Sequence, residues 1–286
     1  MLKSKILHIE PTDVCQAACP QCAREVDISF NKKIHHHIDI KTIKSLLTEK
    51  EIYCLDKMFM CGNYGDPAAG HHTQELYQYF REINPTIVLG MNTNGGLQGI
   101  YWWENLAKIF NQSFDYVVFS IDGLEDTNHM YRKNVVWDRV MKNAQAFIDA
   151  GGIAHWDMLV FEHNEHQIDA CEKKAKEMGF KYFRAKASRR HQTYPISFLN
   201  PPKGWADNSV YDGNIQCMAL KENSIYITAT GKLTPCCWMQ TDYSMFQEIQ
   251  NSWNTNTPNQ TCKSTCTAST NGNSFTNQWQ KEIKFV

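Results

Sequence analysis

The stretch that decides the fold is Ile6-Leu7-His8-Ile9, followed at residues 15–22 by Cys-Gln-Ala-Ala-Cys-Pro-Gln-Cys. The first four residues are typical of a short strand. The three cysteines, spaced Cys-x3-Cys-x2-Cys, place three sulfurs on one loop, where they can face a single soft-metal site. A structural zinc site needs four ligands, and the next Cys or His along the chain is His35. Zinc with a distant fourth ligand is therefore one interpretation, and a 4Fe-4S cluster with one open iron is the other.

Segments with strand and helix character alternate along the first two thirds of the chain. Besides residues 6–9, strand-like runs lie at 58–60, 87–89, 116–121, 156–161 and 182–185, and helix-like runs at 39–47, 74–83, 102–110, 136–150 and 165–178. These alternations predict an α/β fold with a parallel sheet and right-handed crossovers. Because six strands fall short of eight, we expect a partial (β/α)6, TIM-like barrel, with a doubly wound open sheet as the alternative.

Four loops of unusual composition each follow one of these strands. They span residues 15–22, 62–67, 92–95 and 120–123. In both architectures the ligand binds at the carboxyl ends of the strands. We therefore expect the four loops to converge on one rim of the sheet.

Charge and cysteine content limit the classes of function. The 286 residues include 29 Lys and Arg and 30 Asp and Glu, a formal net charge of -1, which argues against nucleic acid or an anionic membrane as the partner. No apolar run approaches the roughly 18 residues of a membrane span, and residues 1–5 lead straight into a strand, so we expect no signal peptide and a cytoplasmic location. In a reducing compartment, 11 cysteines favour metal ligation or catalysis over disulfides.

The last third of the chain has a different character. The alternation stops after about residue 188, and Pro195, Pro201 and Pro202 mark a linker, so we expect a core at 1–190 and an extension at 191–286. In the extension, residues 224–234 predict a β-hairpin. The tail at 252–277 is rich in Asn, Thr and Ser, and a metal would supply the order that apolar burial cannot.

The first cysteine loop resembles that of the radical S-adenosylmethionine (SAM) superfamily. The resemblance also covers Gly62-Asn63-Tyr64-Gly65-Asp66-Pro67, which looks like the family's Gly-Gly-Glu-Pro loop for the methionine amino group, with Asp in place of Glu. It implies that Cys15, Cys19 and Cys22 bind three irons of a 4Fe-4S cluster and that SAM chelates the fourth. One electron then breaks the sulfonium carbon–sulfur bond, and a 5'-deoxyadenosyl radical takes a hydrogen atom from the substrate.

The same resemblance implies further site residues at the strand ends. The expected SAM-binding residues are Gly62, Asn63, Gly65, Asp66, Asn92, Asn94, Ser120, Asp122 and Arg132. Ser120 and Asp122 would hydrogen-bond the ribose, with an ordinary Asp-Gly turn as the alternative. Arg132 would pair with the SAM carboxylate or lie in solvent. Cys61, directly before the Gly-rich turn, would donate a hydrogen atom to a substrate radical or be a small buried residue.

A second group of cysteines resembles the C-terminal extensions called SPASM and twitch, which carry auxiliary iron-sulfur clusters. Its number of thiols suffices for one cluster, the twitch pattern, although Cys262-x3-Cys266 departs from the commoner Cys-x2-Cys. The expected ligands of this second 4Fe-4S cluster are Cys217, Cys236, Cys262 and Cys266. Cys237 can exchange with Cys236, and a structural zinc on the same four cysteines is the alternative.

Together these resemblances imply a radical SAM enzyme with oxidoreductase-like chemistry. The expected substrate is a peptide or protein that undergoes oxidation, crosslinking or epimerisation, and the expected partner is a flavodoxin- or ferredoxin-type electron donor. A radical SAM dehydrogenase of a small molecule is the first alternative. A noncatalytic zinc or iron-sulfur module is the alternative from another class of protein.

Overall fold

A nine-stranded sheet carries the fold of the computed structural model, which describes residues 5–28, 30–188, 190–191, 195–204, 215, 217–238, 262–263, 266 and 281–285. Its strands are β1 (Ile6–Ile9), β2 (Lys57–Met60), β3 (Val88–Thr93), β4 (Tyr116–Ser120), β5 (Ala154–Val160), β6 (Tyr182–Ala187), β7 (Ser224–Ile227), β8 (Leu233–Thr234) and β9 (Lys281–Lys284). Their order across the sheet is β8-β7-β1-β2-β3-β4-β5-β6-β9.

The order of the strands confirms the partial barrel. Strands β1 to β6 adjoin in chain order and pair in parallel. Right-handed crossovers that always step in one direction put every connecting helix on the same face, whereas a doubly wound sheet reverses direction. The doubly wound alternative is therefore wrong. The sheet does not close, because β8 and β9 form its two edges.

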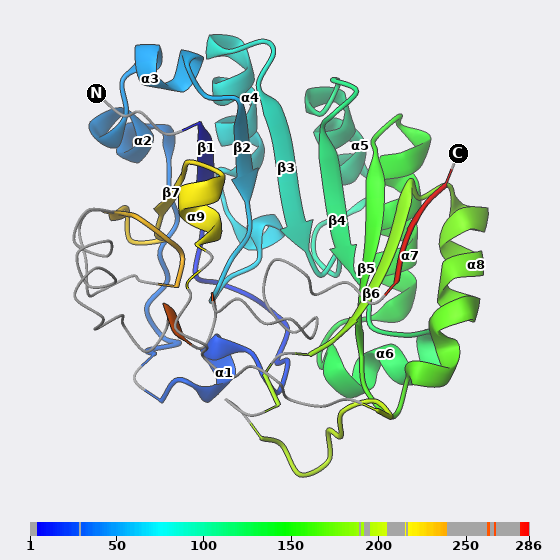
Figure 1. Ribbon diagram of the computed structural model, residues 1–286. Coiled ribbons are helices and arrows are strands. Elements are labelled where there is room, and N and C mark those ends of the chain that lie inside the picture. The colour runs from blue at the N-terminus through cyan, green and yellow to red at the C-terminus, as the bar shows by residue number, and fades with distance from the viewer. Residues whose placement is uncertain are drawn as a thin grey trace.

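Helices cover the outer face of the curved sheet (Figure 1). The helical elements are α1 (Ala23–Val26), α2 (Ile40–Leu46), α3 (Glu49–Tyr53), η1 (Pro67–Ala69), α4 (Thr73–Ile83), α5 (Ile100–Ile109), α6 (Glu125–Tyr131), α7 (Trp137–Asp149), η2 (Glu165–Gln167), α8 (Ile168–Met178) and α9 (Met218–Lys221). The strands and helices predicted from the sequence are all present, with ends shifted by a few residues. The sequence patterns missed the short helices α1, α3, α6 and α9 and the strand β9.

Alternation along the strands separates the core from the site. In β5, Ala154, Trp156, Met158 and Val160 are buried against the helices, and the residues between them are half-buried on the inner face. The indole of Trp156 donates to the carbonyl of Ile121 at 2.9 Å, so its polar atom is satisfied in the core. The inner face of β5 thereby carries His155, Asp157 and Leu159, two polar side chains and one apolar one.

C-terminal residues extend the sheet at both edges. Strand β7 pairs in parallel with β1, and β9 pairs antiparallel with β6. The predicted hairpin is confirmed by the antiparallel pairing of β7 with β8. The division at residue 190 stays a prediction, and most of the tail at 252–277 lies outside the described residues.

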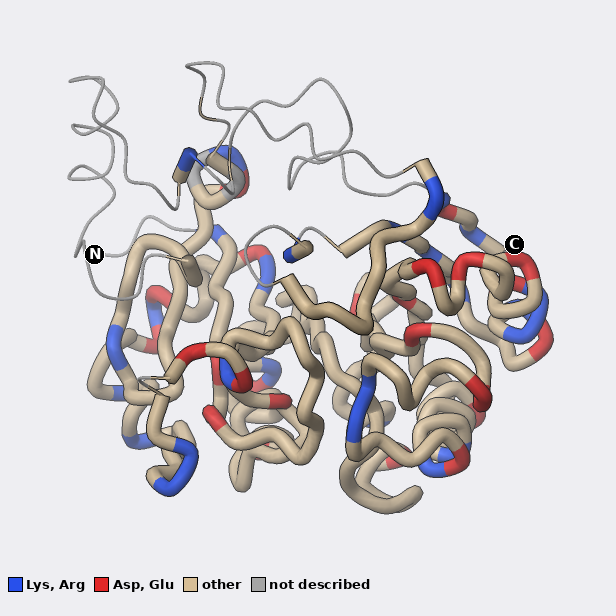
Figure 2. Tube along the Cα trace, turned by 90° about the horizontal axis from the view of Figure 1, so that it is seen from below, with Lys and Arg blue, Asp and Glu red and all other residues tan. Residues whose placement is uncertain are grey.

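The described surface carries both signs of charge. Lys and Arg alternate with Asp and Glu over the outer helices (Figure 2). None of the helices in the described ranges is long and apolar enough to cross a membrane.

A buried ion pair fixes α4 against the sheet. Asp115, 1% exposed, accepts hydrogen bonds from the guanidinium of Arg81 at 2.5 Å and from the amide of Leu89 at 2.8 Å. The partners come from α4 and β3, so this carboxylate joins two layers of the fold.

Replacing Asp115 with Ala should lower the free energy of unfolding by about 3–5 kcal/mol, because the change leaves the guanidinium of Arg81, whose side chain is 12% exposed, without its carboxylate. Urea denaturation measures this loss. Asp138→Ala, an exposed carboxylate at the start of α7, is the matched control and should change the stability by less than about 0.5 kcal/mol. Equal stabilities of the two variants would contradict the role given to Asp115.

Candidate active site

Loops at the carboxyl ends of the strands enclose a cavity of about 310 Å³. This is the lower edge of the sheet in Figure 1, near α1 and α6. The predicted site residues that line it are Cys15, Cys19, Cys22, Cys61, Gly62, Asn63, Gly65, Asp66, Asn92, Asn94, Ser120 and Arg132. Segments from four parts of the sequence thus converge on one cavity, as their positions after the strands predict.

The three thiols of the first loop share the wall of this cavity. Burial raises the pKa of Cys15 and raises that of Cys19 to about 11, while the nearby Arg132 guanidinium acts in the opposite direction on Cys19. Because metal ligation requires thiolates, binding of a metal centre here must release protons.

The chemistry of the donors fits a cluster. Cys15, Cys19 and Cys22 all line the same cavity. Cysteine thiolates are the ligands that hold iron-sulfur clusters, so this set of donors fits such a group.

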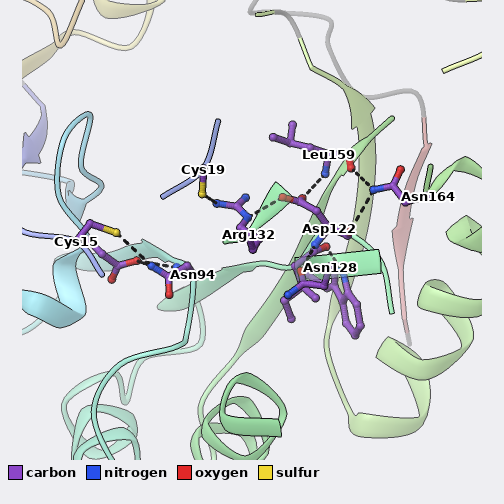
Figure 3. A network of polar contacts seen from close by, with 11 residues as sticks. Cys15, Cys19, Asn94, Asp122, Asn128, Arg132, Leu159 and Asn164 are labelled. Carbon is purple, nitrogen blue, oxygen red and sulfur yellow. Dashed lines mark hydrogen bonds and ion pairs between the residues drawn. The ribbon is translucent and has the colours of Figure 1, made fainter. Parts of the chain in front are cut away.

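Asn94 joins the cysteine loop to the Gly-rich loop. Its side-chain amide donates to Oδ2 of Asp66 at 2.6 Å and lies 3.6 Å from Sγ of Cys15. Its carbonyl oxygen accepts from Nε2 of Gln16 at 2.7 Å. Figure 3 shows this contact between Asn94 and Cys15. One side chain at the end of β3 therefore fixes two loops relative to each other.

Asp66 lines the cavity and is held in place by this contact with Asn94. Its carboxylate accepts from the hydroxyl of Thr93 at 2.7 Å, and from the backbone amides of Asn94 at 2.7 Å and Ala68 at 2.9 Å. Burial raises the pKa of Asp66, and these hydrogen bonds act against the shift. Both carboxylate oxygens accept hydrogen bonds, so Asp66 orients the loop. The expectation that its carboxylate also binds the methionine ammonium group stays a prediction.

Asp122 is not among the residues that line the cavity, and its role at the ribose stays a prediction. It is fully buried, accepts from the amide of Leu159 at 2.6 Å and forms an ion pair with Nε of Arg132 at 2.6 Å. The guanidinium of Arg132 in turn lies 3.9 Å from Sγ of Cys19 (Figure 3). The ion pair with Asp122 thus fixes the Arg132 guanidinium beside the cysteine loop. Arg132 is therefore not a solvated surface residue.

Strands β5 and β6 supply residues whose place at the site no sequence motif indicates. Ser120, Asp157 and Arg184 are neighbours in register across β4, β5 and β6, and Arg184 binds Asp157 with two hydrogen bonds of 2.7 and 2.9 Å. The unassigned lining residues include Thr93, Tyr131, Asp157, Met158, Leu159 and Ser188. The sequence signal that could have indicated them is a charged residue, Asp157 or Arg184, within a mostly apolar strand.

The cysteine loop is also tied to the end of β6. The hydroxyl of Ser188 donates to the side-chain oxygen of Gln21 at 2.6 Å, and the guanidinium of Arg190 donates to its backbone carbonyl at 2.6 Å. Gln21 is fully buried. The loop therefore contacts both halves of the sheet.

The C-terminal cysteines include one contact with the Gly-rich loop. The backbone carbonyl of Cys237 accepts from the side-chain amide of Asn63 at 2.7 Å. A hydrogen bond with Cys236 and burial raise the pKa of the Cys237 thiol. The ligand set Cys217, Cys236, Cys262 and Cys266 stays a prediction.

The family model of the Radical SAM superfamily matches residues 9–175, more than half of the chain. The chain therefore belongs to the radical SAM superfamily, a class of enzymes whose members use a 4Fe-4S cluster and SAM. A comparison with curated protein sequences gives no match.

Solved structures with the same fold include radical SAM enzymes. Streptococcus suis SuiB bound to the precursor peptide SuiA has a TM-score of 0.62 and 17% identity, over 88% of this chain and 65% of SuiB. The structure of anSMEcpe with bound AdoMet and the Cp18Cys peptide has a TM-score of 0.59 and 15% identity, over 88% of this chain and 82% of that one. The chain thus spans just under two thirds of the length of SuiB, and at these identities the similarity shows the fold.

Cys61 should resist alkylation. Burial raises the pKa of its thiol to about 12, so about one molecule in ten thousand carries the reactive thiolate at pH 8. In native protein treated with iodoacetamide at pH 8, mass spectrometry should find the exposed Cys54 modified long before Cys61. Equal rates at the two cysteines would contradict the raised pKa of Cys61.

Proposed function

We propose that this chain reductively cleaves SAM at a 4Fe-4S cluster and abstracts a hydrogen atom from a peptide or protein substrate. The observation that carries the proposal is the cavity shared by Cys15, Cys19, Cys22 and the Gly62–Asp66 loop. The loops after β2, β3 and β4 line a cavity beside the three cysteines. A noncatalytic electron carrier does not need such a cavity, because it binds no SAM. When bound, the cluster and SAM supply the one-electron cleavage that yields a 5'-deoxyadenosyl radical.

The chain's own residues bind and orient the two groups. Cys15, Cys19 and Cys22 provide three ligands for the cluster, and the positive charge of Arg132 lowers the cost of placing negative sulfur ligands in a buried loop. Backbone carbonyls of the Gly62–Asp66 loop are partners for the methionine ammonium group. Asn92 and Ser120 line the same cavity and are our candidates for the polar contacts to the nucleoside.

Cys61 is our candidate for a hydrogen-atom donor. Its thiol lines the cavity, and its raised pKa keeps it in the S–H form that such a donor needs. Its backbone is fixed, because Nε2 of the half-buried, neutral His8 donates to the Cys61 carbonyl at 2.6 Å. Transfer breaks the S–H bond and forms a C–H bond on the substrate, and the electron donor must then return one electron, with one proton, to the sulfur.

The substrate and partners belong to the same proposal. Peptide substrates are supported by the shared fold of SuiB, solved with SuiA, and of anSMEcpe, solved with a peptide. The proposal further includes a flavodoxin- or ferredoxin-type electron donor, a second 4Fe-4S cluster on the C-terminal cysteines, and a cytoplasmic location. Oxidation of a small molecule remains the alternative reaction.

Cys19 provides the test of the first cluster. After anaerobic reconstitution with iron and sulfide, the wild-type protein should hold roughly eight irons and, with dithionite and SAM, release 5'-deoxyadenosine. Cys19→Ala should release none and keep about half of the iron, since one ligand of the SAM-binding cluster is lost. Cys171→Ala, a cysteine buried in α8, is the matched control and should behave as wild type. Cleavage by Cys19→Ala, or stoichiometric zinc with intact SAM in the wild type, would overturn the proposed function.

A variant of Cys262 tests the second cluster independently of the first. Cys262→Ala should lose about half of the iron yet still release 5'-deoxyadenosine at saturating SAM, because the first cluster keeps its three ligands. Iron analysis and chromatography of the nucleoside measure the two quantities. Full retention of iron would exclude Cys262 as an auxiliary ligand.

A further inference from the structure

A buried carboxylate lies behind the Gly-rich loop, and the function proposed above does not use it. Glu10 directly follows β1 and is 1% exposed. Its Oε1 accepts from the backbone amides of Tyr64 at 2.6 Å and Gly65 at 3.1 Å, and its Oε2 accepts from the hydroxyl of Tyr226. Burial alone would disfavour this charge, but both oxygens have hydrogen-bond donors.

This arrangement determines where the carbonyls of the loop point. In a planar trans peptide the N–H and C=O bonds point in opposite directions. Because the amides of Tyr64 and Gly65 point at Glu10, the carbonyls of Asn63 and Tyr64 point away from it. An independent contact agrees, since the carbonyl oxygen of Asn63 lies 3.9 Å from Sγ of Cys22 in the cysteine loop. The carbonyls are thus turned toward the side on which the cavity lies.

The C-terminal segment holds this arrangement in two places. Tyr226 lies on β7, where it pairs in register with His8, and the two rings are 4.6 Å apart. Asn63, within the loop, donates from its side chain to the carbonyl of Cys237 at 2.7 Å. Residues more than 150 positions away in sequence therefore set the conformation of a loop that follows β2.

We propose that Glu10 is a positioning residue for SAM: it turns the carbonyls of the Gly62–Gly65 loop toward the methionine ammonium group, and Tyr226 of the C-terminal strand β7 holds Glu10 in place. The inference rests on the proposed function, because it concerns SAM binding. Its consequence is that the affinity for SAM depends on a tyrosine of the C-terminal extension, acting through Glu10.

The test compares two tyrosines that each lose one buried hydrogen bond. Tyr226→Phe removes the hydroxyl bound to Glu10 and keeps the ring beside His8. Tyr77→Phe is the matched control, because Tyr77 is also fully buried but donates to the carbonyl of Gly90 at 2.7 Å and does not line the cavity. Glu10→Gln is a second variant, nearly isosteric and uncharged.

We expect Tyr226→Phe to raise the KM for SAM about five- to tenfold, and Glu10→Gln about tenfold or more, with kcat for 5'-deoxyadenosine release within about twofold of wild type. Iron content should not change. Tyr77→Phe should leave the KM at the wild-type value.

Hydrogen exchange gives a readout that is independent of activity. In protein without clusters, the amides of Tyr64 and Gly65 should exchange faster in Tyr226→Phe and Glu10→Gln than in wild type, since their acceptor is loosened or uncharged. Tyr77→Phe should leave this exchange unchanged. The comparison does not require a loaded site.

The outcomes separate the inference from the proposed function. Wild-type KM values and wild-type exchange in Tyr226→Phe and Glu10→Gln would overturn the role of Glu10 while SAM cleavage by the wild type stands. Equal changes in Tyr226→Phe and Tyr77→Phe would show general loosening and would also overturn it. A wild-type protein that holds clusters but leaves SAM intact would overturn the proposed function itself.

Discussion

The parallel alignment of β1 to β6 is the constraint on which the site depends. Because parallel strands share one direction, every loop that follows a strand lies at the same edge of the sheet. Cys15 and Arg132, far apart in sequence, therefore line one cavity. The open sheet also leaves two edges, and C-terminal strands cover both.

This convergence places charged groups close together away from water, and each requires a partner. Burial raises the pKa of Glu10, Asp66 and Asp122 alike. Hydrogen bonds from backbone amides support all three, and both oxygens of each carboxylate accept hydrogen bonds. Glu10 and Asp66 orient the Gly-rich loop, and Asp122 orients Arg132 beside Cys19. These three carboxylates thus fix other parts of the protein. Two of them set the conformation of the Gly-rich loop, and the third sets the position of the Arg132 guanidinium.

The sequence predicted what depends on local patterns. The strands and helices of the barrel follow from hydrophobic runs, and the cysteine loop from its spacing. The directions of the side chains around the cavity could not be predicted from local patterns, because they depend on neighbours from other strands. Asp122 is an example, because it accepts from the Leu159 amide and pairs with Arg132, and neither contact is visible in the sequence around it. Glu10 was overlooked because its partner Tyr226 lies 216 residues away. The pairing of β7 with β1 is equally nonlocal and has no signal in either strand alone.

The central claim is that three cysteines near the amino terminus leave one iron of a cluster open for SAM. Mössbauer spectroscopy of protein reconstituted with isotopically labelled iron measures this directly. The account predicts that adding SAM shifts the signal of one iron in the SAM-binding cluster toward higher coordination and leaves the other irons unchanged. Identical spectra with and without SAM would contradict it.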